Sequence, residues 1–202
     1  MVGISTFPLE KNPMPREGGI IKKDWLQFYT REKLFKSIKN GEIKAVGIIQ
    51  SWDTASKIEE HNDYSVCITI LRDSAGINYV LDVYRVKLEF PDLIRKVAWK
   101  YETEKEKYRQ HITVLIEDQA SGTNLIQALR EAHKVYSVPI KPEYDKQTRL
   151  MSVSHIIEDG KCLFPSGEPS WWMDFENELL RFPRAKHDDQ CDALSQALSH
   201  KS

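Results

Sequence analysis

Hydrophobic residues from Val46 onward follow alternating or continuous patterns that predict a run of short β-strands. The segments VGIIQSWD (46–53), YSVCITILRD (64–73) and INYVLDVYRV (77–86) are rich in β-branched residues. The turn sequence DSAG (73–76) separates the second segment from the third. We therefore expect three consecutive antiparallel strands joined by hairpin connections.

Helical and strand patterns alternate in the remainder of the chain. Amphipathic spacing predicts helices over residues 90–109, 121–136, 146–160, 171–182 and 187–198, and apolar runs predict strands over 112–118, 137–142 and 161–165. This order predicts an α/β domain with a ribonuclease H-like mixed sheet, in which three antiparallel strands precede alternating helices and parallel strands. The Gly-rich phosphate-loop motifs GxxxxGK[ST] and GxGxxG are both absent from the sequence.

Residues 1–44 differ from the rest in being rich in Pro, Gly and charge, with little hydrophobic period. We interpret them as an arm or linker that leads into a folded domain over residues 45–202. Lys and Arg outnumber Asp and Glu between residues 11 and 44. This basic excess suits a segment that approaches phosphates, although a solvated linker explains it equally well.

The overall composition indicates a globular domain without a membrane segment. The chain has 202 residues, 41% hydrophobic and 29% charged, with a net charge of -1. No apolar run reaches the length of a membrane span, and the N-terminus has no signal-peptide pattern. Cys67, Cys162 and Cys191 are few and dispersed, which favours a reducing compartment and core positions over disulfides or a zinc site.

The last predicted helix, HDDQCDALSQAL, carries an unusual density of aspartates. Asp188 suits a helix cap and Asp189 suits the first turn, where exposed N–H groups favour anions. Asp192 lies further inside the helix, beside a core-facing stripe, so its carboxylate needs a cation or a hydrogen-bond donor. We interpret Asp192 as a metal ligand, with Asp189 beside it, and capping with a solvated face as the alternative.

Two predicted strands end in further carboxylates, Asp53 in the first and Glu117 and Asp118 in the fourth. If these strands are neighbours, the acids meet at one end of the sheet, where the last helix can bring Asp192. Strand alternation sends Glu117 and Asp118 to opposite faces. We favour Asp118 because it shares a face with Val114 and Ile116, and keep Glu117 as the alternative. Such oxygen ligands suit two Mg²⁺ or Mn²⁺ ions, which can hydrolyse a phosphodiester.

Other polar residues near these segments allow weaker interpretations. Lys146 and Arg149 could bind a phosphate near the site, or simply form a solvated helix start. Asp63 and Asp82 suit structural roles, and His187 suits an outer-sphere group or a bystander. Because unliganded carboxylates repel one another, we expect replacement of a site aspartate to stabilise the metal-free protein.

The motifs SWDTA, IEDQASG, DKQTR, GKCLFP and FENELLRFPRAKHDDQCDAL, in this order, resemble the nuclease domain of the tailed-bacteriophage terminase large subunit. NPMPREGGIIKKDWLQFY resembles the linker to the packaging ATPase of that family. The resemblance implies a two-metal endonuclease that cuts concatemeric double-stranded DNA during genome packaging in the bacterial host cytoplasm. It also implies three partners, namely an ATPase domain, a small terminase subunit and the portal. The metal ligands that it implies are Asp53, either Glu117 or Asp118, and Asp192, with Asp189 as an accessory ligand.

The sequence is compatible with two other functions. Another ribonuclease H-like nuclease, of the resolvase or transposase type, would use the same acids, although the C-terminal motif and the linker argue against it. A catalytically silent prophage remnant would keep the fold and only bind DNA or packaging partners. The intact Asp53, Asp118 and Asp192 argue against such decay.

Overall fold

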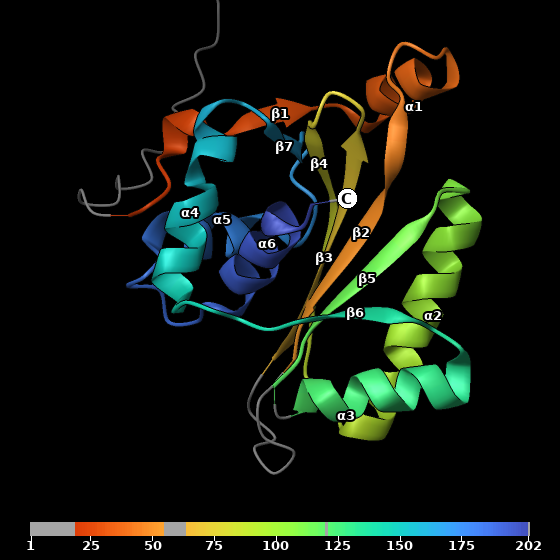
Figure 1. Ribbon diagram of the computed structural model, residues 1–202. Helices are drawn as coiled ribbons and strands as arrows, with labels where there is room; N and C mark the ends of the chain where they lie inside the picture. Colours follow the sequence, from red (N-terminus) through yellow and green to blue (C-terminus); the bar gives the residue numbers. More distant parts are fainter. Residues whose placement is uncertain (1–18, 55–63, 120, 202) are drawn as a thin grey trace, which may run out of the picture.

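The computed structural model describes residues 19–54, 64–119 and 121–201, which form a seven-stranded sheet in the order β1-β7-β4-β3-β2-β5-β6 (Figure 1). An antiparallel meander lies at its centre. Parallel strands flank this meander on both sides, β5 against β2 and β7 against β4. The strands are β1 Gln27–Tyr29, β2 Ala45–Asp53, β3 Ser65–Asp73, β4 Asn78–Val86, β5 Ile112–Glu117, β6 Ser137–Ile140 and β7 Cys162–Pro165. The predicted mixed sheet, with its antiparallel meander and later parallel strands, is confirmed.

Helices cover the sheet on both faces and enclose two hydrophobic cores (Figure 1). Helix α2 (Phe90–Tyr108), helix α3 (Ser121–Ala128) and the π-helical turn Leu129–His133 lie on one face. Helices α4 (Lys146–Glu158), α5 (Trp172–Arg181) and α6 (Asp189–Ser199) lie on the other. We refer to these two faces as the α2 face and the α6 face.

The stretch interpreted as an arm contains regular structure that the sequence pattern did not predict. A 3₁₀ turn (Lys23–Trp25), strand β1 and helix α1 (Arg31–Lys39) follow one another, and β1 pairs in parallel with β7 at the sheet edge. The buried hydrophobic residues of this stretch belong to the two cores: Ile21, Leu26, Tyr29 and Leu34. A strand of three residues is too short to display a period of two, so only tertiary packing reveals it. Residues 1–18, with the basic positions 11–18, and residues 55–63, with Asp63, lie outside the described residues.

Helix α6 is buried along nearly its whole length against β2 and β3, and polar groups anchor both of its ends. At its N-terminus, Glu178 Oε1 of α5 accepts hydrogen bonds from the backbone N–H groups of Gln190 (2.7 Å) and Cys191 (3.1 Å). At its C-terminus, Arg72 of β3 donates to the carbonyls of Ala197 (3.1 Å) and His200. An anion at the N-terminus and a cation at the C-terminus both match the helix dipole. Glu178 and Arg72 therefore fix the helix that carries Asp192.

The α2 face contains a separate buried polar network. Lys100 of α2 forms ion pairs with Glu104 (2.6 Å) and Asp82 (2.7 Å), and Glu104 accepts hydrogen bonds from Gln50 (2.7 Å) and Thr69 (3.2 Å). These contacts fasten α2 to strands β2, β3 and β4. They confirm the structural role expected for Asp82.

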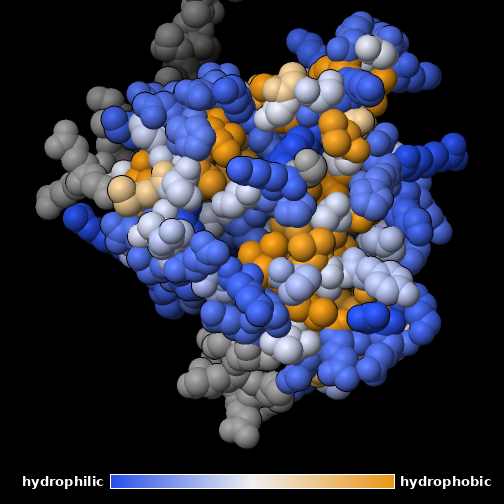
Figure 2. Space-filling view, in the orientation of Figure 1, coloured by the Kyte–Doolittle hydropathy of each residue, from blue (hydrophilic) through white to orange (hydrophobic). Residues whose placement is uncertain are grey.

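The surface and the remaining core agree with the composition. Cys67, Cys162 and Cys191 are buried free thiols, as predicted. Within the described part of the chain, no helix combines the length and hydropathy needed to span a membrane. The face shown in Figure 2 is mostly hydrophilic, and hydrophobic side chains gather near its middle, where Figure 1 places β5 and β6.

Candidate active site

Strands β2 and β5 bring Asp53 and Glu117 to the same end and the same face of the sheet. Trp52 pairs with Ile116 in the parallel ladder, so the next residues along the two strands, Asp53 and Glu117, are neighbours. The residues that precede Trp52 and Ile116 both lie on the α6 face: Ser51 contacts Gln196 of α6, and Leu115 packs in the hydrophobic core on that face. Alternation then directs Asp53 and Glu117 toward α6 as well.

Helix α6 adds Asp192 to this group, and helix α4 supplies the cations that balance it. Asp192 is only 3% exposed, and its two oxygens pair with Lys146 Nζ (2.6 Å) and Arg149 Nη2 (2.9 Å). Arg149 also contacts Glu117 through Nη1 (2.9 Å), and Lys146 contacts Asp188 (2.7 Å). Arg149 thus bridges a strand carboxylate and the helix carboxylate, which links β5, α4 and α6. We call Asp53, Glu117, Asp188, Asp189 and Asp192 with these two cations the acidic cluster.

The pKa values in the acidic cluster show the cost of burying its carboxylates, to which their mutual repulsion adds. Burial raises the pKa of Asp53 well above its ordinary value, and the charges of Asp192, Glu117 and Asp189 raise it further while Lys146 opposes the rise. Burial also raises the pKa of Asp192 to about 6, against the effect of Lys146 and Arg149. Burial raises the pKa of Asp189, with the positive charges of Lys146 and Arg85 opposing it. The cluster therefore has a strong demand for positive charge.

The structure separates Glu117 and Asp118 as alternation requires, and it places Glu117 in the acidic cluster. Asp118 instead accepts a hydrogen bond from Thr123 Oγ1 (2.8 Å) at the start of α3. The preference for Asp118 depended on Val114 and Ile116, but these residues pack on the α2 face. Asp118 follows the same alternation as Val114 and Ile116, as predicted, but that side of β5 faces away from α6.

Asp188 occupies the N-cap position of α6, but its side chain makes no capping hydrogen bond. The expectation that Asp188 caps the helix is wrong, because Glu178 accepts from the first N–H groups and Asp188 pairs with Lys146. The alternative of a solvated helix face is also excluded, since the residues from Gln190 to Leu198 are buried. Ser195 is also buried, and its hydroxyl donates to the carbonyl of Asp192 (2.9 Å).

Sequence reasoning missed the residues that position the acidic cluster. Glu178 is buried in the predicted helix 171–182, so a charged residue at a core position was the available signal there. Arg72 lies in a predicted strand and is only partly buried, so its role had no such signal. Gln196 donates to Ser51 Oγ (2.9 Å) and to the carbonyl of Trp52 (3.3 Å), directly before Asp53. These contacts join α6 to the end of β2.

The donor set of the acidic cluster fits a hard divalent cation. Its ligating atoms are carboxylate oxygens, with no thiolate among them, and such oxygens are preferred by Mg²⁺ and Mn²⁺. Among the described residues, no group of three or more His, Cys, Asp or Glu is arranged to hold a metal ion. Three of the carboxylates, Glu117, Asp188 and Asp192, form ion pairs with Lys146 or Arg149 in this structure. Metal binding by this set therefore requires the side chains to exchange these ion pairs for metal contacts.

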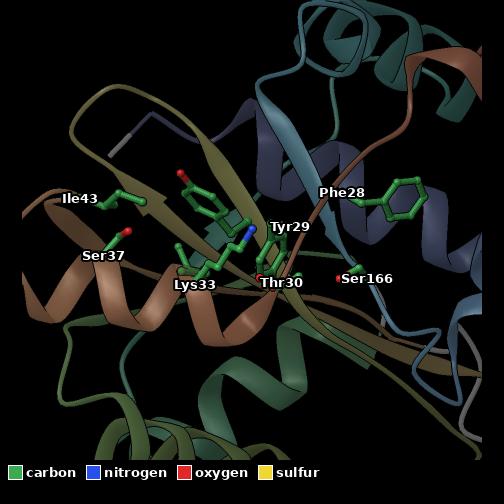
Figure 3. Close-up of a pocket in the computed structure, with 9 residues that line it drawn as sticks. Phe28, Tyr29, Thr30, Lys33, Ser37, Ile43 and Ser166 are labelled. Atoms are coloured by element: carbon green, nitrogen blue, oxygen red, sulfur yellow. The ribbon is translucent and has the colours of Figure 1, made fainter.

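A cavity of about 320 Å³ lies elsewhere, between β1, α1 and the start of β4 (Figure 3). Its lining includes Phe28, Lys33, Ser37 and Tyr79, and none of the described residues that line it is acidic. Strands β2 and β4 run in the same direction, since both are antiparallel to β3. Asp53 lies at the end of β2 and Tyr79 near the start of β4, so the cavity is at the opposite end of the sheet from the acidic cluster. It is therefore separate from the candidate active site.

The strand order, with the antiparallel meander followed by parallel strands and with helices on both faces, defines a ribonuclease H-like domain. A profile of the terminase RNaseH-like domain family matches residues 50–201. Because this match covers most of the chain, the protein belongs to that family, which confirms the resemblance. Comparison with curated proteins gave no significant match.

Solved structures of terminase nucleases have the same fold. The large terminase nuclease of thermophilic phage G20c, solved with bound cobalt, has a TM-score of 0.62 and 16% identity, over 92% of this chain and 98% of that chain. The manganese-soaked human cytomegalovirus terminase nuclease domain has a TM-score of 0.61 and 11% identity, over 88% and 93%. The large terminase nuclease domain of Thermus phage P74-26 has a TM-score of 0.54 and 14% identity, over 87% of this chain and 91% of that chain. At these identities the likeness shows a shared fold.

Proposed function

We propose that this domain is a divalent-metal-dependent endonuclease that cuts concatemeric double-stranded DNA during genome packaging. The observation that carries the proposal is the convergence of Asp53, Glu117 and Asp192 from β2, β5 and α6 at one end of the sheet. Membership of the terminase RNaseH-like family supports it. The strong demand of these carboxylates for positive charge supports a cationic cofactor.

Asp53, Glu117 and Asp192 are the proposed ligands of two Mg²⁺ or Mn²⁺ ions, with Asp189 as an accessory ligand and Asp118 as the alternative to Glu117. When bound, such ions supply an activated water and stabilise the leaving oxygen in phosphodiester hydrolysis. The protein contributes the fixed placement of the ligands. Gln196 holds the end of β2 against α6, and Arg149 spans the gap between β5 and α6.

Lys146 and Arg149 have a second proposed role in binding the DNA backbone. Both lie at the start of α4 and face the acidic cluster. Once the carboxylates bind metal, the two cations can contact phosphate oxygens instead, and the planar guanidinium of Arg149 matches a phosphate well. We further propose the packaging ATPase domain, a small terminase subunit and the portal as partners, in the cytoplasm of the bacterial host.

The proposal is tested by plasmid cleavage with Mg²⁺ and with Mn²⁺. The wild type should nick and then linearise supercoiled plasmid, and Asp53→Ala and Asp192→Ala should abolish both steps. Asp174→Asn is the matched control, because Asp174 is an exposed acid on α5, and it should cleave like the wild type. Glu117→Gln compared with Asp118→Asn identifies the second strand ligand, and we expect the larger loss for Glu117→Gln.

Three results would contradict this assignment. Cleavage that persists in purified Asp53→Ala and Asp192→Ala would show that the acidic cluster is not the active site. A wild type that is inert with every metal would favour the silent remnant. Preference for branched DNA or RNA–DNA hybrids over linear duplexes would favour a resolvase or another ribonuclease H-like nuclease.

A further inference from the structure

A basic residue lies in the same row of the sheet as Asp53, two strands away. Asp53 of β2 pairs with Val66 of β3, and Val66 pairs with Arg85 of β4. Directly paired residues in antiparallel strands project to the same face, and Val66 packs in the α6 core. Neighbouring strands are about 4.8 Å apart, so Arg85 begins roughly 10 Å from Asp53 on the α6 face.

Arg85 is held on an aromatic platform, but two of its nitrogens lack acceptors. Its guanidinium lies 3.8 Å from the centre of the Tyr64 ring, and Lys87 Nζ lies 4.5 Å from the same ring. The His187 ring packs edge-on against Tyr64 at 5.5 Å. Nε and Nη2 of Arg85 are buried, and neither has a hydrogen-bond partner among the described residues. Buried guanidinium donors without acceptors are costly, so this arrangement is poised for an anionic ligand.

The acids nearest to Arg85 do not supply that acceptor. Asp189 is close enough for the charge of Arg85 to influence it, but no hydrogen bond or ion pair joins the two residues within the described part of the chain. Glu117, Asp188 and Asp192 pair with Lys146 and Arg149 instead. Among the described residues, none of these acids therefore accepts a hydrogen bond from Nε or Nη2 of Arg85.

We propose that Arg85 and Lys87, supported by Tyr64, bind a backbone phosphate of the duplex that flanks the cleavage position. This inference rests on the proposed nuclease function and names a positioning surface for it. A planar guanidinium suits phosphate oxygens, and stacking on Tyr64 fixes its orientation before DNA arrives. A separation of roughly 10 Å from Asp53 places this phosphate close to the scissile one but not at it.

Equilibrium binding of a short DNA duplex, measured by fluorescence anisotropy in EDTA across a salt series, tests this surface without catalysis. Each phosphate contact contributes about 0.9 to the slope of log K against log salt. Arg85→Gln and Lys87→Ala should each reduce the slope, by about 0.9 when combined because they bind one phosphate, and the double variant should bind about tenfold more weakly at low salt. Lys96→Ala is the matched control, because Lys96 also lies over aromatic rings, Tyr84 and Trp99, but on the α2 face. It should leave the slope unchanged.

Substitutions of Tyr64 test how the positioning of Arg85 affects DNA binding without changing the charge of the surface. Tyr64→Leu removes the platform but no charge, so it should weaken binding while the salt slope changes little. Tyr64→Phe keeps the ring and should restore wild-type affinity. Thermal melting of each variant checks folding, and Lys87→Ala changes an exposed side chain that the fold does not need.

The outcomes distinguish this inference from the nuclease proposal. A wild type that binds with a slope dependent on Arg85 and Lys87 but never cleaves would support the phosphate surface and refute the nuclease function. A wild type that cleaves, with unchanged slopes in folded Arg85→Gln and Lys87→Ala, would overturn the phosphate surface and leave the nuclease proposal intact. Absence of duplex binding by the wild type at low salt would also overturn it.

Discussion

Replacement of Asp192 by Asn should stabilise the metal-free protein, even though Asp192 forms two ion pairs. The aspartate is almost fully buried between α4, α6 and the end of the sheet, where Lys146 and Arg149 contact its oxygens. Despite these cations, burial raises its pKa to about 6. The folded protein therefore favours a neutral side chain at this position, and Asn provides one of nearly the same shape.

The raised pKa sets the size of the expected gain. The ordinary value is 3.8 and the value in the folded protein is about 6, and each unit corresponds to 1.36 kcal/mol. Ionised Asp192 therefore lowers the unfolding free energy by about 3 kcal/mol relative to the neutral form at pH 7. This is an upper limit for Asn, because its amide N–H groups face Lys146 and Arg149. For a chain of this size, the melting temperature should rise by up to roughly 6–12 °C.

The direction in which the unfolding free energy changes with pH follows from the raised pKa of Asp192. Because the folded pKa lies above the unfolded one, the folded state binds more protons between about pH 4 and pH 6, and stability falls as pH rises through that window. The difference in unfolding free energy between Asp192→Asn and wild type should be small below pH 4 and reach its full value above pH 6. Urea unfolding in EDTA at several pH values measures this difference.

Metal should reverse the order of stability. Mg²⁺ or Mn²⁺ stabilises the wild type according to its affinity for the folded state, whereas Asp192→Asn lacks a ligand oxygen and should gain less. The reasoning is refuted if the variant is less stable than the wild type at pH 7 in EDTA, or if the difference between them does not change with pH.

Three further predictions concern the surroundings of the acidic cluster and the opposite face of the sheet. Asp53→Asn should also raise the unfolding free energy in EDTA at pH 7, since burial and neighbouring charges raise the pKa of Asp53; a lower urea midpoint would contradict this. Glu178→Gln should lower the unfolding free energy by about 1–3 kcal/mol because the α6 N–H groups lose a charged acceptor, whereas the more exposed Glu176→Gln should change it little in the same assay. Lys100→Met should cost about 3–5 kcal/mol by leaving Glu104 buried without its cation, and a thermal melt like that of the wild type would argue against this network.

The hydrophobic periods predicted most of the fold because each long element packs on one continuous face. Strands β2, β3 and β4 and helices α2, α4 and α5 begin and end within a few residues of the predicted limits. Strand β1 and helix α1 were missed because β1 exists only through its pairing with β7 at the sheet edge. Pairing between segments so distant in sequence leaves no local pattern.

The candidate site was predictable to the level of its strand ends and its helix, but not to the level of individual contacts. Asp53 and Asp192 were identified because a carboxylate at the end of an apolar strand or beside a core stripe requires an explanation. The choice between Glu117 and Asp118 depended on which face of β5 lies under α6, and a strand apolar on both faces does not encode this. The pairing of Lys146 and Arg149 with the acids depends on how α4 packs against α6, which no local spacing reveals.

Helix α4 therefore determines the charge balance of the site as much as the acidic residues do. Lys146 and Arg149 are three residues apart in its first turns, so both lie on the side that faces α6 and the end of the sheet. If α4 supplied neither cation, Asp192 would ionise only at a still higher pH, because burial and Asp188 both raise its pKa. The fold thus keeps the buried carboxylate of Asp192 charged at neutral pH with cations on side chains that can turn away. A carboxylate held in this way is able to exchange a protein cation for a divalent one without first losing a proton.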